Sequence, residues 1–130
     1  MAHTHQKRIL IVEDDESVAI MVKTRLESEG FEAHAAASGA VALAYAAERR
    51  PDLVILDVKL PDIGGYQVAR ELRKIYHPWD VPILMLTGMD RPIDELRGFA
   101  YGADAYLTKP YDATEWLKTI AVLLGETALT

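Results

Sequence analysis

Five polar residues follow apolar runs of this sequence, and their types together suit phosphate chemistry. They are Glu13, Asp14, Asp57, Thr87 and Lys109. Clustered carboxylates repel one another unless they are protonated or bridged by a cation, and oxygen ligands in a shallow, solvent-open site suit Mg²⁺. Asp57 could then act as a nucleophile toward a phosphoryl group, whose negative charge the cation and Lys109 would neutralise. The Thr87 hydroxyl could donate a hydrogen bond to a phosphoryl oxygen.

These polar residues end segments that are typical of buried β-strands. Strands are expected at residues 8–13, 31–36, 53–57, 82–87 and 105–108. Apolar residues three or four positions apart predict a helix after each strand. The five apolar stripes are Val18, Val22 and Leu26; Ala42 or Leu43 with Ala46 or Ala47; Val68, Leu72 and Ile75; Ile93, Leu96 and Ala100; and Leu117, Ile120 and Leu124. Strict alternation predicts an α/β fold, a doubly wound (βα)5 arrangement with a parallel five-stranded sheet.

The composition of the strands predicts their order in the sheet. Residues 9–12, 53–56 and 83–86 are continuously apolar, as strands in the middle of a parallel sheet are. Residues 31–35 alternate between apolar and polar types, which indicates an edge strand. The predicted architecture is therefore flavodoxin-like, with the strand order 2-1-3-4-5.

The carboxyl ends of parallel strands meet at one rim of a sheet, with neighbouring strands about 4.8 Å apart. Asp14 and Asp57 should therefore be neighbours, and Thr87 should lie on the other flank of Asp57. Lys109 is expected one strand further away, but its side chain is long enough to reach back. This rim is where open α/β sheets bind their ligands.

Length and composition limit the classes of function. The 130 residues suit one domain, which we expect to span residues 8–125 between tails at 1–7 and 126–130. The net charge of −6 argues against nucleic-acid binding by this chain itself, because neutralising phosphates needs clustered Lys and Arg. The absence of Cys excludes thiolate zinc sites and a cysteine nucleophile. No apolar run approaches the roughly 18 residues of a membrane span, and the polar N-terminus lacks a signal-peptide core, so we expect a cytoplasmic location without membrane association.

Other interpretations are open for single residues. Asp14 or Asp15 could cap the following helix, and Asp57 or Thr87 alone could simply end a strand. A Rossmann dehydrogenase needs a Gly-rich turn where this chain is acidic, and a P-loop motif is absent. An aspartate phosphatase would usually carry a second carboxylate at position 59, which is Lys. The histidines, which we expect away from the rim, are His3, His5, His34 and His77.

The chain resembles the receiver domain of two-component response regulators over nearly all of residues 8–125. Four motifs carry the resemblance, at residues 9–16, 53–65, 84–88 and 102–110. The resemblance implies that Asp57 accepts a phosphoryl group from a phosphohistidine on a histidine kinase or a histidine phosphotransfer protein. It implies Mg²⁺ as the cofactor, with these ligands: Glu13, Asp14, Asp57 and the backbone carbonyl of Lys59.

The resemblance also implies how the domain would respond. Thr87 and Lys109 would bind the phosphoryl group, and Tyr106 would be an aromatic switch that turns inward when Thr87 moves. The fourth helix, fifth strand and fifth helix would then contact a downstream protein, an attached effector domain or a second copy in a homodimer. Such a domain assists its own phosphorylation and dephosphorylation and is not a turnover enzyme. The alternative is a phosphorylation-independent protein-binding module on the same fold. Lys59, two residues after the acceptor, departs from the usual pattern and is expected to alter dephosphorylation.

Overall fold

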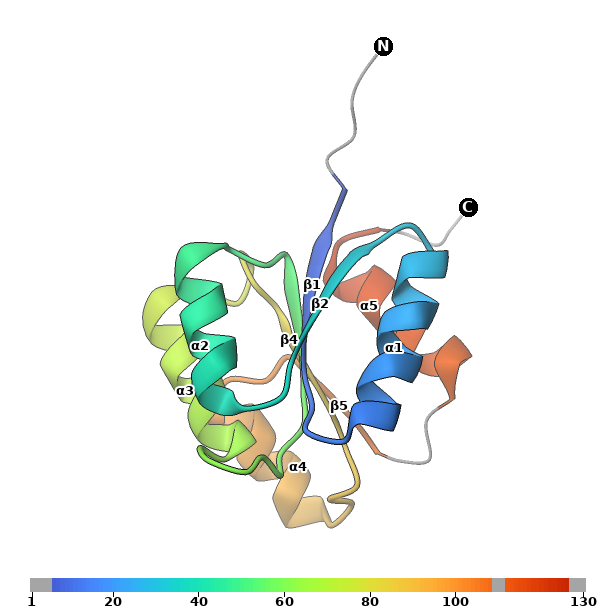
Figure 1. Ribbon diagram of the computed structural model, residues 1–130. Helices are drawn as coiled ribbons and strands as arrows, with labels where there is room; N and C mark the ends of the chain where they lie inside the picture. The colour runs from blue at the N-terminus through green and yellow to red at the C-terminus, as the bar shows by residue number, and fades with distance from the viewer. Residues whose placement is uncertain (1–5, 109–111, 127–130) are drawn as a thin grey trace.

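Strands and helices alternate along the chain (Figure 1). The computed structural model describes residues 6–108 and 112–126. Its elements are β1 (Arg8–Val12), α1 (Glu16–Ser28), β2 (Glu32–Ala36), α2 (Gly39–Glu48), β3 (Leu53–Leu56), α3 (Gly65–Ile75), β4 (Ile83–Thr87), α4 (Pro92–Tyr101), β5 (Ala105–Thr108) and α5 (Ala113–Leu123). Neighbouring strands pair in parallel in the order β2-β1-β3-β4-β5, which confirms the predicted fold class.

Short polar side chains determine where three of the helices begin. The Asp15 carboxylate accepts hydrogen bonds from the backbone N–H groups of Ser17 and Val18 and so starts α1. Ser38 and Asp112 cap α2 and α5 in the same way, which satisfies N–H groups that have no partner inside a helix. These caps lie directly after the strand ends and therefore keep the connections at that rim short.

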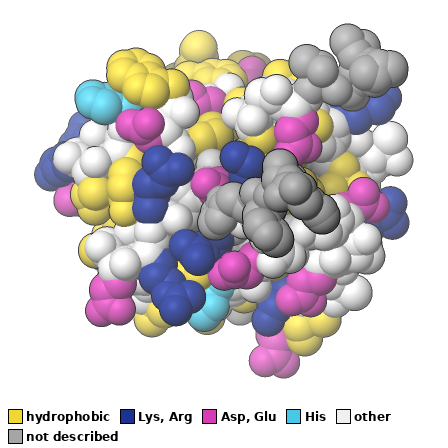
Figure 2. Space-filling view, turned by 90° about the horizontal axis from the view of Figure 1, so that it is seen from above, with side chains coloured by type: hydrophobic (Ala, Val, Ile, Leu, Met, Phe, Trp, Pro, Cys, Tyr) yellow, Lys and Arg dark blue, Asp and Glu magenta, His cyan; other side chains and the backbone are white. Residues whose placement is uncertain are grey.

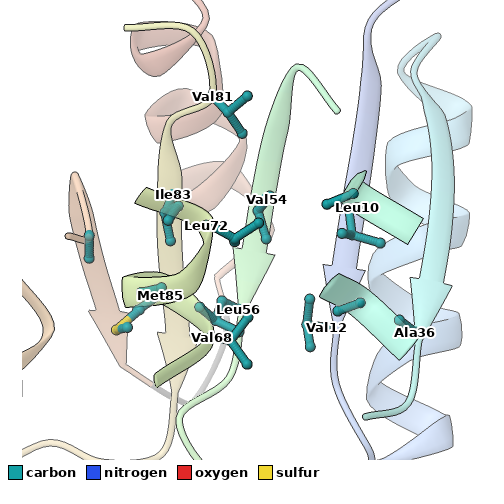
Figure 3. Packing of buried hydrophobic residues seen from close by; sticks show 14 of the residues in the cluster. Leu10, Val12, Ala36, Val54, Leu56, Val68, Leu72, Val81, Ile83 and Met85 are labelled. Carbon is teal, nitrogen blue, oxygen red and sulfur yellow. The ribbon is translucent and has the colours of Figure 1, made fainter. Parts of the chain in front are cut away.

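Helices cover both faces of the sheet, with α1 and α5 on one face and α2, α3 and α4 on the other (Figure 1). Strands β3 and β4 are buried along their whole length, whereas β2 is partly exposed, as expected for an edge. Figure 3 shows Val54 and Leu56 of β3 packed with Val68 and Leu72 of α3. Ile75, the third residue of the stripe expected on α3, is instead half exposed at the end of the helix. The strand that ends at Asp57 is thus well packed against α3.

Helix α4 differs from the prediction. Three residues expected to face the core are exposed: Ile93, Leu96 and Ala100. Of these, Ile93 is 50% and Leu96 is 65% exposed. The buried residues of α4 are Asp94 and Gly98, because the space between this helix and the sheet is occupied by the Tyr106 ring of β5. The predicted helix is therefore present, but the wrong face was assigned to the core.

Figure 2 views the molecule from the rim where the strands begin, opposite to Asp57. Positive and negative side chains are interspersed on this rim. Among residues 6–108 and 112–126, no helix is long and apolar enough to cross a membrane. Carboxylates are gathered at the other rim, around Asp57.

Candidate functional site

Three carboxylates converge at the rim where β1 and β3 end. Glu13, Asp14 and Asp57 each offer one oxygen, and these oxygens all lie within 4.8 Å of one another. The two strands are direct neighbours, and the Asp57 N–H donates to the Val12 carbonyl at 3.0 Å. Glu13 and Asp57 are buried, whereas Asp14 is exposed to solvent. Three close carboxylate oxygens, one of them open to water, form a donor set that suits a hard divalent cation.

The carboxylates of the acidic loop after β1 have different roles. Asp15 caps α1 and so takes the capping interpretation that the sequence left open between Asp14 and Asp15. The Glu13 carboxylate accepts a hydrogen bond from the Asp15 N–H at 3.1 Å. The Glu13 N–H donates to the Ala36 carbonyl of β2 at 3.1 Å. The loop is therefore held on both sides, with Glu13 and Asp14 left to face Asp57.

A hydroxyl group stands on the other flank of Asp57. Asp57 and Thr87 line one pocket of about 260 Å³ together with Lys59, Gly88 and Met89. The Thr87 side chain is 1% exposed, and its Oγ1 accepts a hydrogen bond from the Met89 N–H at 3.3 Å. Because a hydroxyl both accepts and donates, its own hydrogen can be directed at a ligand in this pocket.

Backbone groups also surround the Asp57 carboxylate. The Lys59 N–H lies 3.4 Å from Asp57 Oδ1, so the chain turns back toward the acid two residues later. Gly65 starts α3 so close to the strand end that an added Cβ would lie 2.1 Å from the Asp57 carbonyl oxygen. The Gly65 N–H donates to the Val58 carbonyl at 2.7 Å. Any larger residue at position 65 would displace the backbone that carries Asp57, a requirement that the Gly-Gly pair in the sequence could have signalled.

Thr87 and Tyr106 are connected through hydrogen bonds to the backbone of Met89. The Tyr106 side chain is 7% exposed, and its hydroxyl donates to the Met89 carbonyl at 2.7 Å. Burial, followed by the adjacent Tyr66 hydroxyl, raises the pKa of Tyr106 far above its ordinary value. Tyr66 in turn donates to the Asp94 carbonyl of α4 at 3.0 Å. No local sequence pattern singles out Tyr66 or Asp94, because their contacts join segments distant in the chain.

Lys109, which is expected at the site, lies outside the described residues. Of the histidines, which are expected away from the site, His3 and His5 also lie outside the described residues. His34 stacks on Tyr45 at 4.1 Å and His77 on Trp79 at 4.7 Å, measured between ring centroids. Stacking on an aromatic ring explains the positions of both His34 and His77.

Comparison with known proteins agrees with this geometry. The family model described as "Response regulator receiver domain" matches residues 9–121, which is most of the chain. The chain belongs to this family. It is a receiver domain of the kind found in two-component systems.

Two curated relatives illustrate the relation of this receiver domain to longer proteins. The DNA-binding dual master transcriptional regulator RpaA of Synechocystis is 40% identical over 120 residues, which cover 92% of this chain and 50% of that protein. The alkaline phosphatase synthesis transcriptional regulatory protein PhoP of Bacillus subtilis is 40% identical over 109 residues, which cover 84% of this chain and 45% of that protein. The receiver domain thus spans about half the length of the curated relatives it matches.

Solved structures match over nearly their full length. A putative response regulator from Chloroflexus aurantiacus is 37% identical with a TM-score of 0.86, and the match covers 93% of this chain and 99% of that one. The chemotaxis protein CheY4 of Vibrio cholerae is 34% identical with a TM-score of 0.85, covering 92% and 99%. The fold of this receiver domain is therefore the CheY-like, flavodoxin-like one.

Proposed function

We propose that this receiver domain accepts a phosphoryl group on Asp57 from a phosphohistidine of a histidine kinase or a histidine phosphotransfer protein. The observation that supports this most strongly is the position of Asp57 at a strand end, between two carboxylates on one flank and the Thr87 pocket on the other. A lone strand-end aspartate would not have chemically suitable neighbours on both sides.

In the proposed transfer, a carboxylate oxygen of Asp57 attacks phosphorus, an O–P bond forms, the P–N bond breaks, and the imidazole of the donor leaves. The Thr87 hydroxyl donates to a phosphoryl oxygen while its Oγ1 continues to accept from Met89. Lys109 is proposed to bind the same group, on the strength of the family resemblance.

We propose Mg²⁺ as the cofactor, held by Glu13, Asp14, Asp57 and the Lys59 carbonyl. The convergence of three carboxylate oxygens fits this hard cation. When bound, Mg²⁺ would offset the charge of the carboxylates and of the phosphoryl oxygens.

The acceptor is tested by incubation with acetyl phosphate and Mg²⁺, followed by intact-mass analysis. Wild type should gain one phosphoryl mass, and Asp57→Asn should gain none. Asp90→Asn, at an exposed carboxylate of the nearby β4–α4 connection, is the matched control and should label like wild type. Failure of wild type to label, or labelling of Asp57→Asn at the wild-type level, would refute the proposal.

The cation site is tested by Mg²⁺ titration with the carboxyl carbons followed by NMR. Asp14→Asn should weaken binding at least about tenfold, since it removes one charged ligand. Asp15→Asn should leave the affinity nearly unchanged, because Asn also caps helices and position 15 lies outside the carboxylate cluster. Equal effects at the two positions would show that only general charge matters.

We propose that the surface formed by α4, β5 and α5 contacts the downstream partner, whether that is a separate protein, an effector domain or a second copy. The exposed apolar residues Ile93 and Leu96 support this proposal. Size-exclusion chromatography with and without beryllofluoride, a phosphoryl mimic, tests whether the partner is a second copy.

Lys59 lines the pocket beside Asp57, and we propose that its side chain restricts the access of water to the acyl phosphate. Lys59→Ala should shorten the phosphoryl lifetime, whereas Lys59→Met, which keeps the length of the side chain, should preserve more of it. Equal lifetimes of all three proteins would exclude this influence.

A further inference from the structure

The backbone of Met89 is held from both sides by residues of the proposed switch. Its N–H donates to Thr87 Oγ1 at 3.3 Å, and its carbonyl accepts from the Tyr106 hydroxyl at 2.7 Å. The N–H and the carbonyl belong to successive peptide units that share the Met89 Cα, so a displacement of the Tyr106 hydroxyl can reach Thr87 through the backbone of a single residue.

Tyr106 can lie in its buried position because α4 has no side chain at position 98. A Cβ added to Gly98 would lie 2.8 Å from Cδ2 and 3.0 Å from Cε2 of the Tyr106 ring, and 3.0 Å from Sδ of Met85. The methionine sulfur could move aside, but ring atoms can move only if the whole ring turns. Gly98 is buried in the interior of a helix, where Gly is otherwise unfavourable relative to Ala. Clearance for the ring is a physical reason for glycine at this position.

Helix α4 is held so that this clearance faces the ring. The Tyr66 hydroxyl of α3 donates to the Asp94 carbonyl at 3.0 Å, in the first turn of α4. The Asp94 carboxylate accepts from the backbone N–H of Arg91 at 3.1 Å and from its guanidinium at 3.1 Å. The start of α4 is thus fixed one turn before Gly98.

We infer that Gly98 is a positioning residue that makes room for the buried position of Tyr106 and, through the Met89 backbone, helps to hold the Thr87 hydroxyl beside Asp57. The inference rests on the proposed function for what Thr87 does there. We expect this clearance to favour the buried ring whether or not Asp57 is phosphorylated.

The first test follows Tyr106 itself in the full chain by NMR of Cζ-labelled tyrosine, with the resonance assigned through Tyr106→Phe. In wild type without phosphoryl mimic, the Tyr106 resonance should remain unshifted at the pH where free tyrosine ionises. Mg²⁺ and beryllofluoride should change it little. In Gly98→Ala the resonance should ionise near the pH of free tyrosine, and beryllofluoride should now move it. Ionisation of wild-type Tyr106 like free tyrosine, or wild-type behaviour of Gly98→Ala, would overturn the inference.

A double-mutant cycle separates the clash from general helix effects. Gly98→Ala should lower the midpoint of urea unfolding in wild type but raise it in a Tyr106→Ala background, where only the helix preference for Ala remains. The exposed substitution Leu96→Ala on the same helix should have the same small effect in both backgrounds. A change of equal sign and size for Gly98→Ala in both backgrounds would contradict a contact with the ring.

The rate of Asp57 labelling by acetyl phosphate tests the connection to the site. Gly98→Ala should slow labelling roughly tenfold, the equivalent of one lost hydrogen bond, and should have no effect when Tyr106 is already Ala. An unchanged rate in Gly98→Ala would refute the link through Met89. A wild-type chain that does not label at all would count against Asp57 as the acceptor, while the NMR result would still decide the position of Tyr106.

Discussion

Helices α3 and α4 lie side by side on the same face of the sheet, yet they are attached to it by different forces. Helix α3 buries Val68, Ala69 and Leu72 against the strands. Helix α4 buries Asp94 and Gly98, and its large apolar residues face solvent. Helix α3 therefore contributes more apolar packing to the base of the site than α4 does.

Several contacts of α4 are directional and polar. Its first turn is tied by Arg91 and Tyr66, as described above, and its last residues are followed by Gly102 in the left-handed conformation with φ of 119°. Arg73 of α3 donates to the Gly102 carbonyl at 2.9 Å and forms a 2.6 Å ion pair with Asp104. A net hydrogen bond contributes about 1 kcal/mol, less than the burial of one large apolar side chain. Such a helix keeps its orientation, although each of its hydrogen bonds contributes only a small free energy.

The largest effect expected from this difference concerns leucines on the two helices. Leu72→Ala should lower the free energy of unfolding by about 2–5 kcal/mol, because it leaves a cavity under α3. Leu96→Ala should change it by less than about 0.5 kcal/mol, since that side chain is largely exposed. Urea unfolding at equal temperature measures both values, and comparable losses would mean that α4 is as firmly packed as α3.

The same contrast explains how far the fold could be predicted from sequence. Continuous apolar runs identified the central strands, and Asp15, Ser38 and Asp112 mark helix starts by local chemistry alone. The face of α4 was assigned wrongly because periodicity finds a stripe of apolar residues without saying whether the protein core is on that side. What displaces that stripe is a tyrosine from a strand that follows in sequence, which no local pattern reveals.

The candidate site also contains residues that the sequence predicts and residues that it does not. Glu13, Asp14 and Asp57 were expected to meet because parallel strand ends share a rim, and the structure brings them together. Gly98 and Tyr66 were not expected, because their importance arises from contacts between α4, α3 and β5. Strand order is enough to predict which carboxylates lie together, but the residues around them depend on packing in three dimensions.

A second, smaller effect is expected at Tyr66. Tyr66→Phe removes the hydrogen bond to the Asp94 carbonyl and should cost about 1 kcal/mol of stability. Backbone amides in the first turn of α4 should exchange with solvent faster, while those of α3 stay unchanged. Tyr76→Phe is a matched control, because its hydroxyl donates to the Ala46 carbonyl of α2 at 2.6 Å. If both substitutions accelerate exchange in α4 equally, Tyr66 is not a specific tie to that helix.

The smallest expected effect is confined to acidic pH and concerns Asp94. Hydrogen bonds from the Arg91 guanidinium hold the pKa of the Asp94 carboxyl below its ordinary value. A carboxyl whose pKa is lower in the folded state stabilises the fold above its unfolded pKa and loses this contribution as the pH falls through the folded pKa. The stability difference between wild type and Asp94→Asn should therefore be constant from about pH 7 to pH 5 and shrink below about pH 4. Glu95→Gln, an exposed neighbour, is the control for general charge. A difference that persists unchanged at about pH 3 would mean that Asp94 holds α4 by shape and hydrogen bonding rather than by its charge.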